Sequence, residues 1–245
     1  MFSFFVRCFP KVVLSRKCME SPKRILLVIA HPDDECLFFG PTILALLRQS
    51  QRHFYVLCLS NGDYEGKGHV RKQELYDSCT SLGILSGNIL LVKHDHLRDD
   101  PKANWSTELV GKLVAAFVQS HDIDTLITFD GYGVSGHKNH SAIYVAIEEL
   151  LLHSKFPQFC TPYALESVNI IRKYMPSLFE LPFSLLLSSF MYVAEREDYS
   201  KLLYAMNQHY SQVVWFRRLY LIFSRYLSVN TLRPISGSRQ SKIVK

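Results

Sequence analysis

A short run of chemically active side chains follows an apolar segment near the start of the chain. Residues 25–30 read ILLVIA, and the next five read HPDDE. His31 and Asp34 are three residues apart where a strand would turn into a helix, so an imidazole and a carboxylate can face one ion. Asp33 points in another direction at this spacing and stays available as a base. The run therefore predicts part of a metal site with an acid–base group beside it.

A second cluster of potential metal ligands lies in the sequence GHKNH at residues 136–140. His137 and His140 repeat the three-residue step. Two histidines and one aspartate make a three-ligand zinc site with one position left for water, which is the arrangement of catalytic zinc sites. Structural zinc usually has four protein ligands, often cysteines, so this set favours catalysis.

Each motif alone also has a simpler interpretation. HPDDE can be a turn whose acids cap a helix, because Asp and Glu favour helix N-termini. His137 and His140 alone can be polar surface residues. The occurrence of both motifs after predicted strands of one domain favours the metal site.

Four apolar runs rich in β-branched residues alternate with helical patterns along the chain. Continuous apolarity, without polar alternation, is typical of strands that are covered on both faces. The predicted strands are 24–30, 54–60, 88–93 and 125–130, the predicted helices are 37–48, 70–82, 107–119 and 141–153, and two later runs, 168–172 and 190–194, are predicted edge strands. The alternation predicts an α/β fold of Rossmann-like type, with a mostly parallel sheet flanked by helices.

The polar segments that follow these strands indicate where a ligand binds. In parallel sheets ligands bind beyond the carboxyl ends of the strands. His31 follows the first predicted strand, Asn61-Gly62-Asp63 the second, and Asp130-Gly131 the fourth. We therefore expect the site at this edge of the sheet.

The length and composition are those of one domain. The chain has 245 residues, of which 48% are hydrophobic, and we predict an N-terminal arm at 1–23, a catalytic domain at 24–230 and a flexible tail at 231–245. The net charge of +6 is explained by ordinary surface residues, with contact to phosphates or anionic lipid as the alternative. The basic residues are scattered, so no nucleic-acid partner is predicted. Six cysteines without a C-x-x-C pair are predicted to be free thiols.

The C-terminal third offers a possible membrane contact. No apolar run approaches the ~20 residues that span a bilayer. Residues 213–228 are predicted to form a helix with Arg217, Arg218 and Arg225 on one stripe and a broad apolar and aromatic face. Such a helix either lies in a membrane interface or packs on the core with solvated arginines. The apolar residues 183–194 are either a buried strand or a lipid-facing loop.

The two ligand motifs together resemble the LmbE-like, PIG-L de-N-acetylases. These are zinc hydrolases that remove the acetyl group from N-acetylglucosamine conjugates. The resemblance runs from about residue 24 to about residue 230. The segments TFD at 128–130, GVSGH at 133–137 and WFRRLY at 215–220 are similar to the eukaryotic members, which act on N-acetylglucosaminyl-phosphatidylinositol.

The resemblance implies roles for the five central residues. His31, Asp34 and His140 match the metal ligands, and the implied cofactor is Zn²⁺, although the same ligands accept iron, cobalt or nickel. Asp33 matches the general base that activates water. His137 matches the residue that stabilises the tetrahedral oxyanion and protonates the departing amine.

The resemblance also implies two substrate-binding residues and a cellular setting. Arg71 and Asp99 match substrate contacts; the alternatives are a surface helix arginine and a loop cap. The implied partners are the glycolipid substrate and a membrane surface, at the cytosolic face of the endoplasmic reticulum, in the synthesis of glycolipid anchors. Two other functions stay open, a deacetylase of a soluble N-acetylglucosamine conjugate and a catalytically silent sugar- or lipid-binding subunit.

Overall fold

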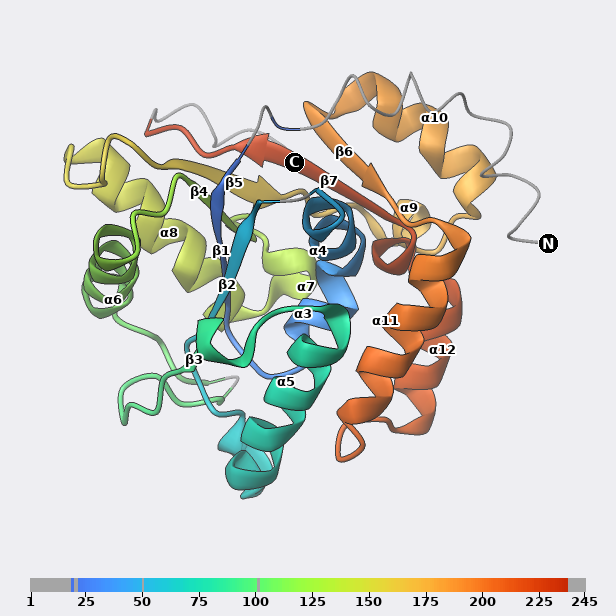
Figure 1. Ribbon diagram of the computed structural model, residues 1–245, viewed down its shortest axis with the longest axis horizontal. Coiled ribbons are helices and arrows are strands. Elements are labelled where there is room, and N and C mark those ends of the chain that lie inside the picture. The colour runs from blue at the N-terminus through green and yellow to red at the C-terminus, as the bar shows by residue number, and fades with distance from the viewer. Residues whose placement is uncertain (1–18, 20–21, 50, 101, 238–245) are drawn as a thin grey trace.

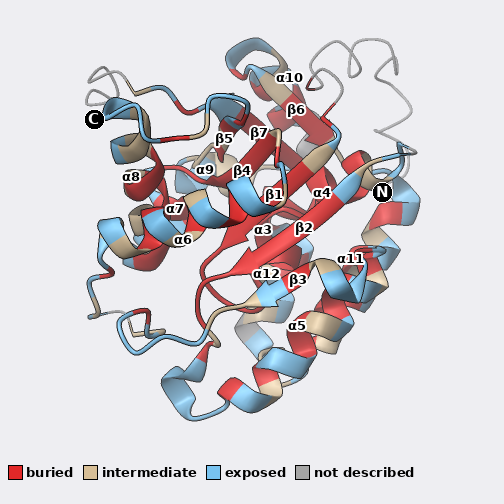
Figure 2. Ribbon diagram, turned by 60° about the vertical axis from the view of Figure 1, so that its left-hand side comes forward, coloured by how far each residue is buried: buried red, intermediate tan, exposed pale blue. Residues whose placement is uncertain are grey.

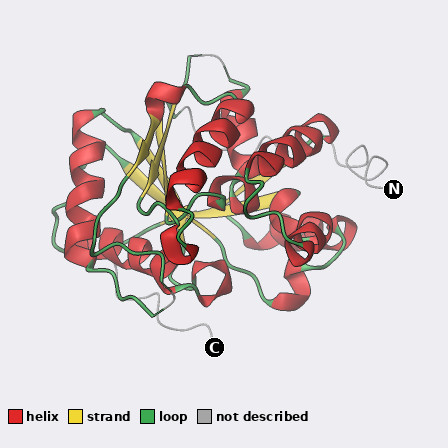
Figure 3. Ribbon diagram, turned by 90° about the horizontal axis from the view of Figure 1, so that it is seen from below, coloured by secondary structure: helices red, strands yellow, loops and turns green. Residues whose placement is uncertain are grey.

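One central sheet with helices on both faces forms the protein (Figures 1 and 3). The computed structural model describes residues 19, 22–49, 51–100 and 102–237. In these residues seven strands have the order β3-β2-β1-β4-β5-β7-β6. Their bounds are β1 Arg24–Ile29, β2 His53–Cys58, β3 Ile89–Leu91, β4 Thr125–Phe129, β5 Thr161–Leu165, β6 Phe190–Val193 and β7 Val229–Pro234.

The direction of the strands confirms the predicted fold class. β1 pairs in parallel with β2 and β4, β2 with β3, and β4 with β5. Only β7 runs against its neighbours β5 and β6 among the described strands. The strand order reverses between β1 and β4, and this switch point is where α/β sheets bind their ligands.

The helices connect and cover these strands. All four helices predicted in the first two thirds of the chain are confirmed, with shifted ends and with the first divided in two at Phe39. The bounds are α3 Asp34–Phe38, α4 Gly40–Leu47, α5 Gly68–Leu82, α6 Thr107–Ser120, α7 Gly133–Gly136, α8 Lys138–Leu152, α9 Ile170–Lys173, α10 Ser177–Leu187, α11 Arg196–Gln208 and α12 Trp215–Phe223.

Burial of the central strands explains their apolar sequences. Five of the six residues of β1 and all five of β4 are buried, and Figure 2 shows these strands inside the molecule. Complete burial of a large aliphatic side chain contributes roughly 1.5–3 kcal/mol to stability. These strands therefore anchor the loops that follow their carboxyl ends.

The structure corrects several predictions in the C-terminal third. The predicted strand 168–172 is wrong: Asn169 accepts a hydrogen bond from the Arg172 N–H (2.9 Å) and begins the helix α9. The predicted strand 190–194 is confirmed as β6, whereas 183–187 belong to α10. The predicted helix 213–228 is too long, because α12 ends at Phe223 and the Ser224 side chain accepts from the Tyr226 N–H.

The strands β5 and β7 were not predicted, and β7 moves the domain boundary. Its last pair joins Pro234 to Tyr163 of β5, so residues 231–234 of the predicted tail belong to the sheet. Most of the predicted arm and residues 238–245 lie outside the described residues, but Met19 is buried and its N–H lies 3.4 Å from the Tyr192 hydroxyl.

Two further expectations concern cysteines and membrane spans. The cysteines of the described segments are free and buried, namely Cys36, Cys58, Cys79 and Cys160. In the same part of the chain, none of the helices has the length and apolarity needed to cross a membrane.

Candidate active site

The turn after β1 directs the first group of polar side chains into the protein. The Asp34 carboxylate folds back on the strand end, where its Oδ2 accepts the N–H groups of Ala30 (3.0 Å) and His31 (2.9 Å). Its Oδ1 is therefore left to face the second motif. Asp33 has a φ of 109°, a left-handed conformation that is uncommon for a residue with a side chain and is a form of strain found at functional sites.

The second motif is held by the start of α8. His137 is the N-cap of this helix, and its Nδ1 accepts the Asn139 N–H at 3.3 Å. The His140 ring stacks on Phe129, with ring centroids 3.9 Å apart. Its Nδ1 lies 3.1 Å from the Gly133 carbonyl, so its Nε2 points toward Asp34. Gly133 has a positive φ, and a Cβ there would lie 2.7 Å from the His140 Cβ, so only glycine fits.

The two motifs, separated by about a hundred residues of sequence, meet in space. One ring nitrogen from each of His31, His137 and His140 lies within 4.8 Å of the others. Asp34 lies among them, at 3.3 Å from His140 Nε2 and 3.7 Å from His31 Nδ1. His140 Nε2 is buried and faces the Asp34 carboxylate without the geometry of an ordinary hydrogen bond. A buried imidazole nitrogen that faces a carboxylate in this way fits a metal ion.

The charges of these groups suit a cation. Burial lowers the pKa of His31 and of His137, which keeps both as the neutral imidazoles that bind metals. Burial opposes the charge of Asp34, but His140 and His31 lower the pKa of this carboxyl and keep it ionised. Burial likewise opposes charge on His140, but the Asp34 carboxylate raises the pKa of His140. The site thus attracts positive charge.

Two arginines contact the side chain of Asp33. Arg71 Nη2 lies 3.5 Å from Asp33 Oδ2 and donates to the Pro32 carbonyl at 2.7 Å. Its Nη1 donates to Asp99 Oδ2 at 3.1 Å, and Asp99 Oδ1 lies 3.2 Å from His31 Nε2. Arg71 is buried, so the alternative of a surface helix arginine is excluded. Burial raises the pKa of Asp99. Its contact with His31 places Asp99 at the border of the site and not at the cap of a distant loop.

The second arginine, Arg217 of α12, was not predicted to be in the site. We expected it on a solvated or membrane-facing stripe, but it forms an ion pair with Asp33. The local pattern of α12 could not show this, because the partner is 184 residues away in the sequence. Only the position of a charge within the apolar segment WFRRLY marked it as unusual.

Another buried pair that was not predicted supports the site from behind. Glu35 Oε1 lies 2.6 Å from His209 Nε2 and accepts the Ser78 hydroxyl at 2.6 Å. Glu35 Oε2 accepts the Asp33 N–H at 3.1 Å. The carboxylate thus ties the end of α11 to the backbone of the proposed base. Glu35 could have been identified from the sequence, because it is the last residue of HPDDE, whereas no motif in the sequence contains His209.

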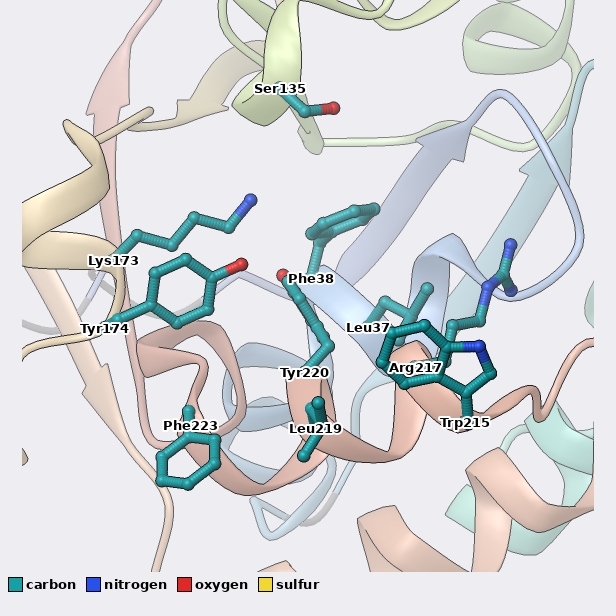
Figure 4. A pocket seen from close by; sticks show the side chains of 10 residues that line it. All are labelled: Leu37, Phe38, Ser135, Lys173, Tyr174, Trp215, Arg217, Leu219, Tyr220 and Phe223. Atoms are coloured by element: carbon teal, nitrogen blue, oxygen red, sulfur yellow. The ribbon is translucent and has the colours of Figure 1, made fainter.

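A cavity of about 710 Å³ lies next to the residues of this site, and Figure 4 shows the side chains that line it. Arg217 and Phe38 belong to its wall, and the Phe38 ring lies 5.8 Å from that of His140. The complete lining consists of Leu37, Phe38, Ser135, Lys173, Tyr174, Trp215, Arg217, Leu219, Tyr220 and Phe223. The cavity is therefore adjacent to the cluster, with Phe38 and Arg217 between them.

Comparisons with known proteins agree with this geometry. Residues 26–151 match the PIG-L family model, described as GlcNAc-PI de-N-acetylase. The chain is 42% identical over 210 residues to N-acetylglucosaminyl-phosphatidylinositol de-N-acetylase of Bos taurus, covering 85% of this chain and 82% of that protein. The chain belongs to the PIG-L family. A PIG-L relative from Schizosaccharomyces pombe, described as a probable enzyme of the same name, is 39% identical, with 85% and 86% of the two chains covered.

Solved structures confirm the fold. The N,N'-diacetylchitobiose deacetylase of Pyrococcus horikoshii has a TM-score of 0.68 and 15% sequence identity, and the match covers 98% of this PIG-L chain and 96% of that chain. The predicted family and the predicted LmbE-like α/β fold are therefore both confirmed.

Proposed function

We propose that this chain hydrolyses the N-acetyl group of N-acetylglucosaminyl-phosphatidylinositol, giving glucosaminyl-phosphatidylinositol and acetate. The observation that carries the proposal is that the buried imidazoles of His31 and His140 lie 3.7 Å and 3.3 Å from the Asp34 carboxylate, with Asp33 next to Asp34 in the chain. The names of the relatives from Bos taurus and Schizosaccharomyces pombe supply the substrate. The reaction belongs to the synthesis of glycolipid anchors.

The donor set fits a divalent transition metal, and we assign zinc to it. His31 and His140 are two ligands, and the third is either Asp34 or His137. We choose Asp34, because it contributes a negative charge and lies close to both imidazoles. His137 is only partly buried, and its Nδ1 already accepts a hydrogen bond. When bound, zinc polarises the acetamide carbonyl and lowers the pKa of water from about 15.7 toward ~7.

The protein's own residues move the protons. Asp33 takes a proton from the attacking water at its carboxylate, which Arg71 and Arg217 hold in place. The nitrogen of glucosamine departs with the proton that Asp33 has taken, and not with one from His137 as the resemblance implies, because burial lowers the pKa of His137. The products are acetate and a free amine. General acid–base catalysis of this kind contributes typically ~10²–10⁴-fold to the rate.

His137 is suited to stabilise the oxyanion without being charged. Burial lowers its pKa, and its Nδ1 accepts the Asn139 N–H. A neutral His137 therefore carries its proton on Nε2 and donates a hydrogen bond to the developing negative oxygen. One such donor is typically worth about 2.7–4 kcal/mol in the transition state.

We assign Arg71 and Asp99 to hydroxyl groups of the sugar; their mutual contact and the 3.2 Å between Asp99 and His31 support this assignment.

Exposed apolar side chains border the cavity. On α12, Trp215, Leu219 and Phe223 both line the cavity and are exposed. These side chains support contact with a membrane surface, at the cytosolic face of the endoplasmic reticulum, where a glycolipid could enter without leaving the bilayer.

The test is acetate release from the glycolipid by purified protein. We expect activity that a chelator abolishes and zinc restores. A metal-loaded protein that releases no acetate from this substrate would exclude the proposed reaction. A lipid-free N-acetylglucosamine conjugate that reacts as well as the glycolipid would favour the soluble-substrate alternative.

A further inference from the structure

Lys173 brings a positive charge without an anionic partner into the cavity beside the site. It is the last residue of α9 and is partly buried. Its ammonium lies 5.2 Å from the ring centroid of Tyr220 and 5.9 Å from that of Tyr174, but it pairs with no carboxylate in the described part of the chain. Burial lowers its pKa, and no neighbouring acid counteracts this effect. Removing an ammonium from water without a counter-ion is unfavourable, which indicates that an anion binds here.

Two tyrosine hydroxyls share this part of the cavity. Figure 4 shows the polar ends of Lys173, Tyr174 and Tyr220 directed toward one region of the cavity. The Tyr220 hydroxyl is buried, and the Ser224 side chain is its polar neighbour, although the two do not meet the geometry of an ordinary hydrogen bond. Burial raises its pKa well above the usual value, so Tyr220 keeps its proton and can donate it. One ammonium and two hydroxyl donors match the oxygens of a phosphate group.

Apart from Ser135 and Arg217, the rest of the cavity wall is apolar. Leu219 and Phe223 follow Tyr220 along α12, and Trp215 begins this helix. The Phe38 ring stands between the two regions, 5.8 Å from the ring of His140 and 6.1 Å from that of Tyr220. The three regions would fit a ligand with three parts. Its sugar would lie at the cluster, its anionic group near Tyr220, and its apolar group along Leu219 and Phe223.

We propose that Lys173, Tyr174 and Tyr220 form a subsite for the phosphodiester of a glycerophospholipid. The inference rests on the proposed function, because the phosphodiester is that of the substrate whose acetamide lies at the cluster. The subsite holds the phosphate while the glycerol and acyl groups follow Leu219 and Phe223 toward the membrane. Lys173 is thus a specificity residue that distinguishes the phospholipid from a phosphate-free sugar conjugate.

The test compares two substrates with and without the Lys173 charge. Wild-type protein and Lys173→Met are assayed for acetate release from N-acetylglucosaminyl-phosphatidylinositol and from N-acetylglucosaminyl-inositol, which lacks the phosphate. Neutral detergent micelles make the substrate the only anionic lipid. We expect KM for the phospholipid to rise roughly tenfold or more in the variant, as for loss of one charge-assisted hydrogen bond. The kcat/KM for the phosphate-free compound should not change.

Matched variants separate the subsite from general effects. Lys112→Met removes an exposed positive charge on α6 and should change neither substrate, whereas Lys173→Arg should keep most of the phospholipid activity. Tyr220→Phe removes only the hydroxyl and should raise KM for the phospholipid severalfold, which tests the proposal even if Lys173→Met does not fold.

The outcomes distinguish failure of the proposed deacetylation from failure of the phosphodiester subsite. Wild-type protein that cleaves neither substrate would overturn the proposed function itself. Wild-type protein that cleaves both, with Lys173→Met and Tyr220→Phe slowing both equally or neither, would overturn the subsite alone. An effect of Lys173→Met that is confined to binding of anionic vesicles would also overturn it, because Lys173 would then contact bulk lipid.

Discussion

The buried Glu35–His209 pair should contribute strongly to the stability of the fold, and Glu35→Gln tests this. The substitution keeps the shape of the side chain and removes its charge. In the folded protein both side chains have no exposed surface, and Glu35 accepts hydrogen bonds from Ser78 at 2.6 Å and from the Asp33 N–H at 3.1 Å. Removal of one member of a buried pair costs about 3–5 kcal/mol.

The structure places the expected value at the lower end of this range. His209 can lose its proton when the carboxylate is gone, so no charge needs to remain buried. We therefore expect Glu35→Gln to lower the free energy of unfolding by about 3 kcal/mol. In a domain of this size each 1 kcal/mol shifts the melting temperature by about 2–4 °C, which gives a decrease of roughly 6–12 °C.

The assay is urea denaturation near neutral pH, followed by tryptophan fluorescence, with equal zinc content in all samples. Glu65→Gln is the matched control, because Glu65 is exposed and pairs with the equally exposed Lys67 at 2.8 Å; its unfolding midpoint should equal that of the wild type. An unfolding midpoint of Glu35→Gln that equals that of Glu65→Gln would refute the reasoning. Activity below the melting temperature should also fall, because the same carboxylate holds the backbone of Asp33.

Three other predictions concern the base, the ligands and pH. Asp33→Asn should keep its zinc and lose roughly 10²–10⁴-fold in turnover, measured as metal content and acetate release; full turnover would exclude Asp33 as the base. His140→Ala should lose the metal while His137→Ala keeps it, and the opposite result would make His137 the ligand. Burial opposes charge on His209, but the Glu35 carboxylate raises the pKa of His209 in the folded protein. The stability that this raised pKa adds is complete below the pKa of His209 in the unfolded chain, about 6.5, and is lost as the pH rises through the pKa in the folded protein. The wild type should therefore exceed His209→Gln in unfolding free energy by more near pH 6 than in alkaline solution, and a difference independent of pH would contradict this.

The central strands and the two ligand motifs could be predicted from local sequence. β1, β2 and β4 are buried on both faces, so their sequences are continuous apolar runs that a single pattern detects. The first ligand motif follows β1, and the second follows β4 after the short helix α7; the parallel sheet places the ends of these neighbouring strands together. Proximity of His31 to His140 followed from topology alone.

The C-terminal elements could not be predicted, because contacts distant in sequence determine them. β7 contains the buried polar residues Asn230 and Thr231; Asn230 accepts the Thr42 hydroxyl at 2.9 Å and donates to the Phe38 carbonyl at 2.8 Å. No local pattern shows that these groups have partners. The ion pair of Arg217 with Asp33 has the same origin, and the helical pattern of α12 correctly marked its amphipathic character but not its partner.

The most direct test of the central claim is an anomalous diffraction measurement on crystals of the zinc-loaded protein. We predict one strong peak within about 2.0–2.2 Å of donor atoms from His31, Asp34 and His140, with Asp33 near it but not bound. A peak that lies elsewhere, or no peak at this cluster in protein that actively releases acetate, would contradict the account.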